Sequence, residues 1–173
     1  YMDWKKFDTA LSYLTYSTGF KTGSFEPKGT ELVSFKPEDV TNYEIGFKVD
    51  AFEHRLRINS ALYYMEYSDM QTRVAEAGEK ITDLYLYLTN AGEATVEGFE
   101  LEVTGRPTDK MSVIATFNYT KGEYQEFDTP IYKDFQVTTV DRSDEPFGGT
   151  PEKSGSLMVS YDIPAESAGL FVP

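Results

Sequence analysis

Two glutamates placed two residues apart, Glu100 and Glu102, are the pattern in this sequence that comes closest to a catalytic pair. On an extended strand such neighbours point to the same side, about 7 Å apart, a spacing at which two carboxyl groups can hydrolyse a glycosidic bond. Nothing else in the sequence supplies a sugar cleft, and a row of charges along a wet strand face explains both residues. We therefore predict no catalytic residues and no enzyme activity.

The sequence also has few residues that could bind a metal or a cofactor. The chain has no cysteine and one histidine, His54, which argues against thiolate sites, histidine metal centres and Ser-His-Asp catalysis. The segment 148–154 resembles a phosphate loop, but Glu152 stands where the second glycine is required. We predict no metal site and no cofactor.

Charge and hydropathy exclude two further classes. The net charge of -13 and the pI of about 4.4 argue against nucleic acid as a partner, because phosphate binding needs clustered Lys and Arg. No window approaches the run of about 18 apolar residues that a membrane helix needs. A barrel strand needs only about 9 to 11 residues and shows every second one to lipid, so a β-barrel is not excluded.

The segment 41–49 alternates large apolar and polar side chains without a break. Successive side chains of a strand point to opposite faces, so this segment predicts one oily face and one wet face. Such a strand fits either a soluble sandwich or a barrel with lipid outside and water inside. The apolar side chains are Tyr43, Ile45, Phe47 and Val49, and the polar face carries Asn42, Glu44, Gly46 and Lys48.

Alternation resumes from Leu56 and predicts a hairpin with the first strand. Placing Asp50 opposite Arg55 across a tight turn pairs Val49 with Leu56, and it keeps every polar residue on one side. A second hairpin is predicted from 95–104 and 111–120. Further strands are predicted at 9–18 and 154–163, but the apolar side chains of the first compete for both faces, so the facing of these two strands stays open.

The connections between the predicted strands alternate in length. They are short near 50–55, 105–110 and 164–168, and long near 19–37, 68–90 and 121–151. Long loops are uncommon in compact soluble domains. Short turns at one end and long loops at the other are typical of outer-membrane barrels, so this asymmetry favours the barrel.

Several segments, taken in order, resemble the C-terminal barrel half of TonB-dependent outer-membrane receptors. They are YSTGFKTG at 16–23, FKPE at 35–38, NYEIGFK at 42–48, YSDMQ at 67–71, NAGEA at 90–94, GFELE at 98–102 and TPE at 150–152. The resemblance implies an all-β, antiparallel up-and-down meander in the outer membrane, contributing about 7 to 8 strands to a larger barrel of about 22 strands.

The same resemblance implies active uptake of a ferric siderophore or a similar large, scarce nutrient, either a small-molecule chelate or a glycan. The implied partners are outer-membrane lipid, the receptor's own plug domain, and TonB acting through the plug. No plug sequence, TonB-contacting box or terminal aromatic residue is visible, so we expect residues 1–173 to be an internal part of the barrel, without the plug domain and the closing strands.

This interpretation divides the candidate residues into three sets. The predicted lipid-facing set is Tyr43, Ile45, Phe47, Val49, Leu56, Ile58, Leu62, Phe99, Leu101, Val103, Val113 and Phe117. The predicted luminal or plug-facing set is Asn42, Glu44, Lys48, Arg57, Asn59, Glu100 and Glu102. Candidate extracellular ligand contacts are Lys21, Lys28, Tyr124 and Tyr132.

Two other functions fit the strand pattern. A passive porin-like channel would share the two-faced strands but lack energy coupling. A soluble glycan-binding β-sandwich would pack the oily faces against a second sheet instead of lipid.

Overall fold

The architecture is an open antiparallel sheet with hairpins at one end, seen in a computed structural model that describes residues 7–77, 84–90, 92–133, 136–145 and 151–163. The strands are β1 (Phe7–Lys21), β2 (Ser24–Lys28), β3 (Glu31–Phe35), β4 (Glu38–Ala51), β5 (Leu56–Ser68), β6 (Gln71–Ala77), β7 (Leu84–Asn90), β8 (Gly92–Thr108), β9 (Met111–Lys133), β10 (Gln136–Asp141) and β11 (Lys153–Tyr161). The described residues contain no helix that could cross a membrane.

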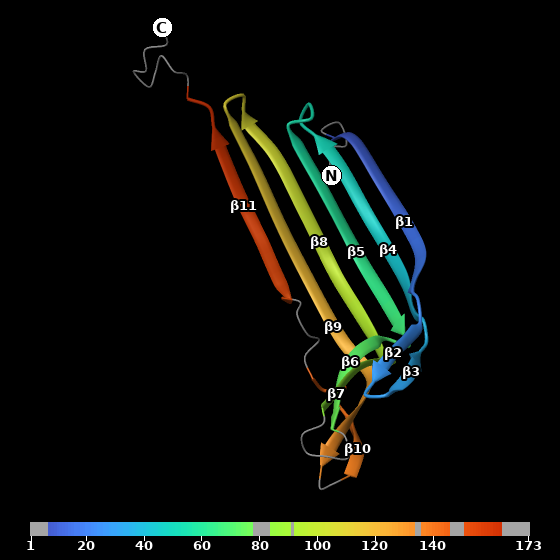
Figure 1. The fold of residues 1–173 in the computed structure, drawn as a ribbon. Coiled ribbons are helices and arrows are strands. Elements are labelled where there is room, and N and C mark those ends of the chain that lie inside the picture. Colours follow the sequence, from blue (N-terminus) through green and yellow to red (C-terminus); the bar gives the residue numbers. More distant parts are fainter. Residues whose placement is uncertain (1–6, 78–83, 91, 134–135, 146–150, 164–173) are drawn as a thin grey trace.

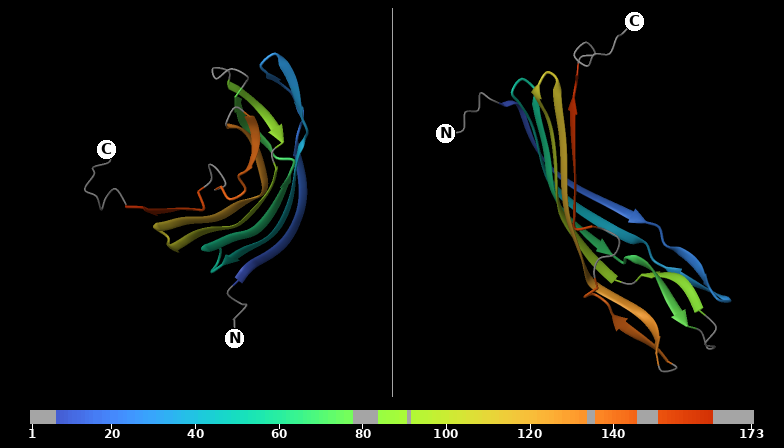
Figure 2. Two further views of the ribbon diagram at one scale, coloured as in Figure 1. Left: turned by 90° about the horizontal axis from the view of Figure 1, so that it is seen from below. Right: turned by 90° about the vertical axis from the view of Figure 1, so that its left-hand side faces the viewer.

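Six long strands form a curved wall in the order β1-β4-β5-β8-β9-β11 (Figures 1 and 2). Every pairing between neighbours is antiparallel. β10 pairs only with the distal part of β9, so the main sheet has seven strands among the described residues. The wall does not close on itself, and the predicted all-β meander is confirmed.

All three long connections lie at one end of the wall, which we call the hairpin end, and the short turns lie at the other, the turn end (Figure 1). Most of the described residues in these connections lie in strands. β2 pairs with β3, β6 with β7, and β10 with the distal part of β9. The predicted short turn at 164–168 lies outside the described residues.

The register of the first hairpin differs from the sequence prediction by two residues. Ala51, not Asp50, is the last residue before the turn to be paired, and its partner is Leu56, so Val49 lies opposite Ile58. The turn conformation is the reason: Phe52, Glu53 and His54 adopt φ values of 58°, 58° and 60°, and the chain reverses over residues 52–55, one residue later than the expected turn at 51–54. A shift of two leaves each side chain on its predicted face.

The structure settles the facing of β1 and β11. Leu14 lies opposite Ile45 and Tyr16 opposite Tyr43, so these β1 side chains join the oily face. On β11 the paired residues are Leu157 with Ala115 and Val159 with Val113, which places both on the same face.

Little of the described chain is buried. Buried apolar residues gather mainly near the hairpin end, where Val74, Tyr87, Ala94, Val96 and Phe127 are at most 9% exposed. Among the described residues no large side chain is fully buried, and Leu14, Leu62 and Leu157 are 81%, 51% and 71% exposed. The described strands therefore do not cover the oily face of the wall.

Candidate functional site

The wall separates the two predicted residue sets onto opposite faces. Register places Lys48, Asn59 and Glu102 side by side on β4, β5 and β8. The neighbouring positions Phe47, Ser60 and Leu101 form a row on the other side. We call these the polar face and the apolar face, and every residue of each predicted set falls on the corresponding face by strand alternation.

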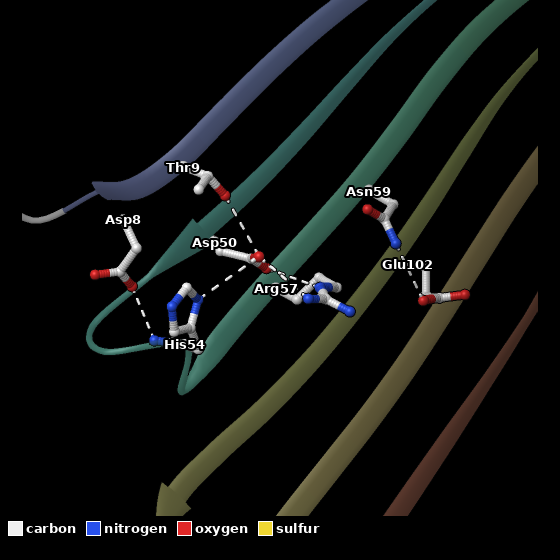
Figure 3. Close-up of polar contacts among 7 residues, drawn as sticks. All are labelled: Asp8, Thr9, Asp50, His54, Arg57, Asn59 and Glu102. Atoms are coloured by element: carbon white, nitrogen blue, oxygen red, sulfur yellow. Dashed lines mark hydrogen bonds and ion pairs between the residues drawn. The ribbon is translucent and has the colours of Figure 1, made fainter.

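The polar face near the turn end holds a network centred on Asp50 (Figure 3). Arg57 donates from Nε to Oδ1 of Asp50 at 2.7 Å and from Nη2 to Oδ2 at 3.1 Å. Thr9 donates to the same carboxylate at 3.4 Å, and Nδ1 of His54 lies 3.7 Å from it. Asp8 accepts a 2.8 Å bond from the backbone N–H of His54, so these contacts hold the left-handed turn against β1.

Two tyrosines cover two glycines in the middle of the polar face. Tyr13 lies opposite Gly46, and Tyr63 lies opposite Gly98, and in each case the ring occupies the space that a β-carbon would need. Neither glycine therefore leaves open space on this face. The Tyr13 hydroxyl donates to Glu44 at 2.7 Å.

Other polar-face residues are joined more loosely. Nζ of Lys48 lies 5.7 Å from the centre of the Tyr13 ring, and Asn59 donates to Glu102 at 3.3 Å. The described residues contain no group of three or more His, Cys, Asp or Glu side chains arranged to hold a metal ion.

Toward the hairpin end, the apolar face ends at a slanted line of charged residues. Moving from the turn end along each strand, the first charged residue on this face is Asp39 on β4, Glu66 on β5, Glu97 on β8, Lys121 on β9 and Lys153 on β11. Residues that pair across the sheet form rows, and rows on the apolar face follow every second residue of a strand. From β4 to β11, over four steps between strands, the line moves three such rows toward the turn end, from the row of Asp39 to the row of Ile45.

The slope of this line is measurable from strand geometry. Three rows of two residues are about 20 Å along the strands, and four spacings between strands are about 19 Å, so the line is inclined by about 45°. Strands of outer-membrane barrels tilt by about 35–45° from the membrane normal. The charged line therefore runs as a membrane surface would run across tilted strands.

The candidate ligand-contact residues lie toward the hairpin end, and their environments differ from one another. The side chain of Lys21 is exposed, and the ring of Tyr124 stacks on Phe127 with 4.5 Å between centroids. The side chain of Tyr132 lies outside the described residues. Lys28 has an internal partner instead of an open position, because its Nζ lies 2.7 Å from Oε2 of Glu76.

A junction at the base of the hairpins was not anticipated from the sequence. The side-chain amide of Gln71 donates to the carbonyls of Lys36 at 3.0 Å, Thr22 at 3.1 Å and Lys21 at 3.4 Å. Its backbone N–H donates to Glu38 at 2.7 Å. One buried side chain thus joins the ends of β1, β4 and β6 where the chain leaves the wall.

Asn90 completes this junction from the end of β7. It accepts from the backbone N–H of Lys36 at 2.7 Å and donates to the carbonyls of Lys36 and Asp69 at 3.1 and 2.6 Å. The segments FKPE, YSDMQ and NAGEA, which carry the family resemblance, therefore meet in space. The presence of all three segments in one chain was the sequence signal that could have indicated this junction.

The fold and its two faces define the class as the wall of an outer-membrane-type β-barrel. Residues 3–171 match the family described as TonB dependent receptor-like, beta-barrel. The chain belongs to the TonB-dependent receptor β-barrel family.

Individual relatives agree with this assignment. The chain is 29% identical over 144 residues to the metal-pseudopaline receptor of Pseudomonas aeruginosa, covering 81% of this chain and 18% of that protein. It is 31% identical to a probable TonB-dependent siderophore receptor of Acinetobacter baumannii, covering 73% and 16%. The chain thus spans less than one fifth of the length of these relatives.

A solved structure with the same fold is the ferric yersiniabactin uptake receptor of Yersinia pestis. The TM-score is 0.63 at 22% identity, and the match covers 90% of this chain and 21% of the other.

Proposed function

We propose that this chain forms part of the barrel wall of an outer-membrane receptor that takes up a chelated nutrient in a TonB-dependent manner. The slanted line of charge from Asp39 to Lys153 carries this proposal, because a bilayer surface crossing tilted strands gives this slope. In this assignment the apolar face contacts lipid and the polar face lines the lumen, where it faces water and the plug domain.

The height of the apolar face supports the same arrangement. On β5 the residues that point to the apolar face are uncharged from Leu56 to Tyr64. This is about 27 Å along the strand and about 21 Å along the membrane normal at a tilt of about 40°. This is close to the band of about 25 Å in known barrels. Tyr16, Tyr43 and Tyr64 lie in one row near the hairpin-end limit of the apolar face, where amphipathic rings suit the membrane boundary.

The hairpin end is then extracellular, and the turn end faces the periplasm. Lys21, Tyr124 and Tyr132 remain candidates for contact with the transported substrate. The names of the relatives support a metal chelate as the substrate class, and an anionic chelate would suit the exposed ammonium of Lys21.

Uptake by cells tests this function. We expect deletion of the gene encoding the full-length protein to abolish uptake of radiolabelled iron supplied as ferric yersiniabactin or of metal supplied as its pseudopaline complex, and reintroduction of the gene to restore it. A proton uncoupler should stop this uptake in the intact strain, whereas entry through a passive channel would continue. Unchanged uptake of both chelates after deletion would contradict the proposed substrate class.

A further inference from the structure

Hydrogen bonds and ion pairs join the β2–β3 hairpin to the β6–β7 hairpin, farther from the wall than the junction at Gln71. Lys28 on β2 pairs with Glu76 on β6 at 2.7 Å, and Tyr87 on β7 donates to the same Glu76 oxygen at 2.6 Å. Nζ of Lys28 also lies 4.8 Å from the centre of the Tyr87 ring. One ammonium, one carboxylate and one phenol therefore satisfy each other across two hairpins.

A second link joins the same two hairpins. Arg73 on β6 donates to Glu26 on β2 at 3.1 Å, and the backbone N–H of Leu88 on β7 donates to the other oxygen of Glu26. Both oxygens of this carboxylate are thus bound by the neighbouring hairpin.

Burial distinguishes the first link from an ordinary surface ion pair. The side chains of Lys28 and Glu76 are only 24% and 14% exposed, whereas those of Arg142 and Glu145, an ion pair beyond β10, are 42% and 46% exposed. Partly buried ion pairs add little net stability, because desolvation offsets the attraction, but in some proteins they fix one arrangement of the elements that carry them, and removing one partner leaves the other charge uncompensated.

We infer that Lys28, Glu76 and Tyr87 are positioning residues that make the two hairpins one rigid unit over the barrel wall. Lys28 acts inside this unit and does not contact the substrate. The substrate-facing surfaces of both hairpins then keep a fixed spacing, and a displacement of one hairpin carries the other with it. The functional part of this inference rests on the proposed uptake function.

Distance measurements on the full-length receptor test the unit directly. Spin labels at L32C on β3 and L86C on β7 occupy positions that are 70% and 52% exposed, and this chain contributes no other cysteine. Dipolar EPR should give one narrow distance distribution. It should broaden in Lys28→Met and Glu76→Gln, and narrow again in the charge-swapped K28E/E76K variant.

Arg142→Met is the matched control and should leave the distribution unchanged. Heat-modified migration in gels confirms that every variant has a folded barrel. A broad distribution in the wild-type receptor, or one that stays narrow in Lys28→Met, overturns the inference. In cells, Lys28→Met should raise the KM for the chelate that is taken up without lowering the maximal rate. If neither chelate is taken up, the proposed function fails while the distances still decide the inference.

Discussion

The phenol ring of Tyr63 on β5 covers Gly98, its directly opposite neighbour on β8, and its hydroxyl lies 2.9 Å from Oγ1 of Thr120 on β9. One side chain thereby spans three strands on the polar face. Tyr13 covers Gly46 in the same way one hairpin earlier. Pairing an aromatic ring with a cross-strand glycine helps to fix register, because a β-carbon at the glycine position would overlap the ring.

Substitution of Gly98 by Ala should therefore destabilise the barrel. A β-carbon there would overlap the Tyr63 ring and approach the carbonyl oxygen of Tyr119 to 2.7 Å, and overpacking of this kind costs about 1–3 kcal/mol. Urea unfolding of the full-length receptor in lipid vesicles measures the loss. Gly105→Ala is the control on the same strand, since its β-carbon would meet only Leu56 at 3.9 Å. Equal stability of the two variants would contradict the role of the ring.

Adjacent positions on β5 test which face contacts lipid. Ser60 lies in the apolar row between Phe47 and Leu101, whereas Ala61 lies on the polar face opposite Glu100. Ser60→Arg should cost about 2–4 kcal/mol, because it places a cation in the middle of the bilayer. Ala61→Arg should cost much less, because it faces the lumen beside a carboxylate. The same vesicle unfolding assay compares the two variants, and a larger loss for Ala61→Arg would reverse the assignment of the faces.

Strand alternation was sufficient to predict the faces but not the register. The pattern of Tyr43, Ile45, Phe47 and Val49 has a period of two, so it fixes which side each residue occupies and is indifferent to a shift of two. The shift depends on the left-handed turn that follows Ala51. The residue types of this turn do not predict that conformation, because left-handed φ values are uncommon for residues other than glycine.

The facing of β1 could not be predicted for a related reason. Leu11 and Leu14 are equally apolar and point to opposite sides, so local pattern gives no preference. The deciding relationship is between strands, since the Tyr13 ring fits over Gly46 only when Leu14 joins the oily face. Contacts between distant segments, such as Lys28 with Glu76, are likewise invisible to local pattern.

Gln71→Glu should loosen the hairpins while leaving the wall intact. The substitution removes the amide donor that three backbone carbonyls share and adds a carboxylate beside Glu38, and leaving such buried acceptors without a donor costs about 1–3 kcal/mol. Limited proteolysis of the full-length receptor should show faster cleavage between residues 21 and 38 or 68 and 92. Gln125→Glu, which alters a single exposed bond to Thr95, should cleave at the wild-type rate, and equal cleavage of both variants would exclude a special role for the junction.

The link between the hairpins should open in acid. Burial by itself raises the pKa of Glu76, but the hydrogen bonds from Lys28 and Tyr87 outweigh it and hold that pKa below its ordinary value. A carboxyl group whose pKa is lower in the folded state stabilises that state. The stabilisation is complete at a pH above the pKa of the unfolded state, about 4.3 for glutamate, and it is lost as the pH falls through the pKa of the folded state. The hydrogen bond to Glu76 raises the pKa of Lys28, so its contribution is lost only in strong alkali.

The EPR distance between labels at positions 32 and 86 should consequently stay narrow at pH 7 and pH 5.5 and broaden below about pH 4. Glu76→Gln is the matched control, because it has no carboxyl group to titrate and should show a similar distribution throughout this range. A wild-type distribution that broadens already between pH 7 and pH 5.5 would assign the transition to another group. A transition of equal size in Glu76→Gln would show that the Lys28–Glu76 pair does not govern the spacing of the hairpins.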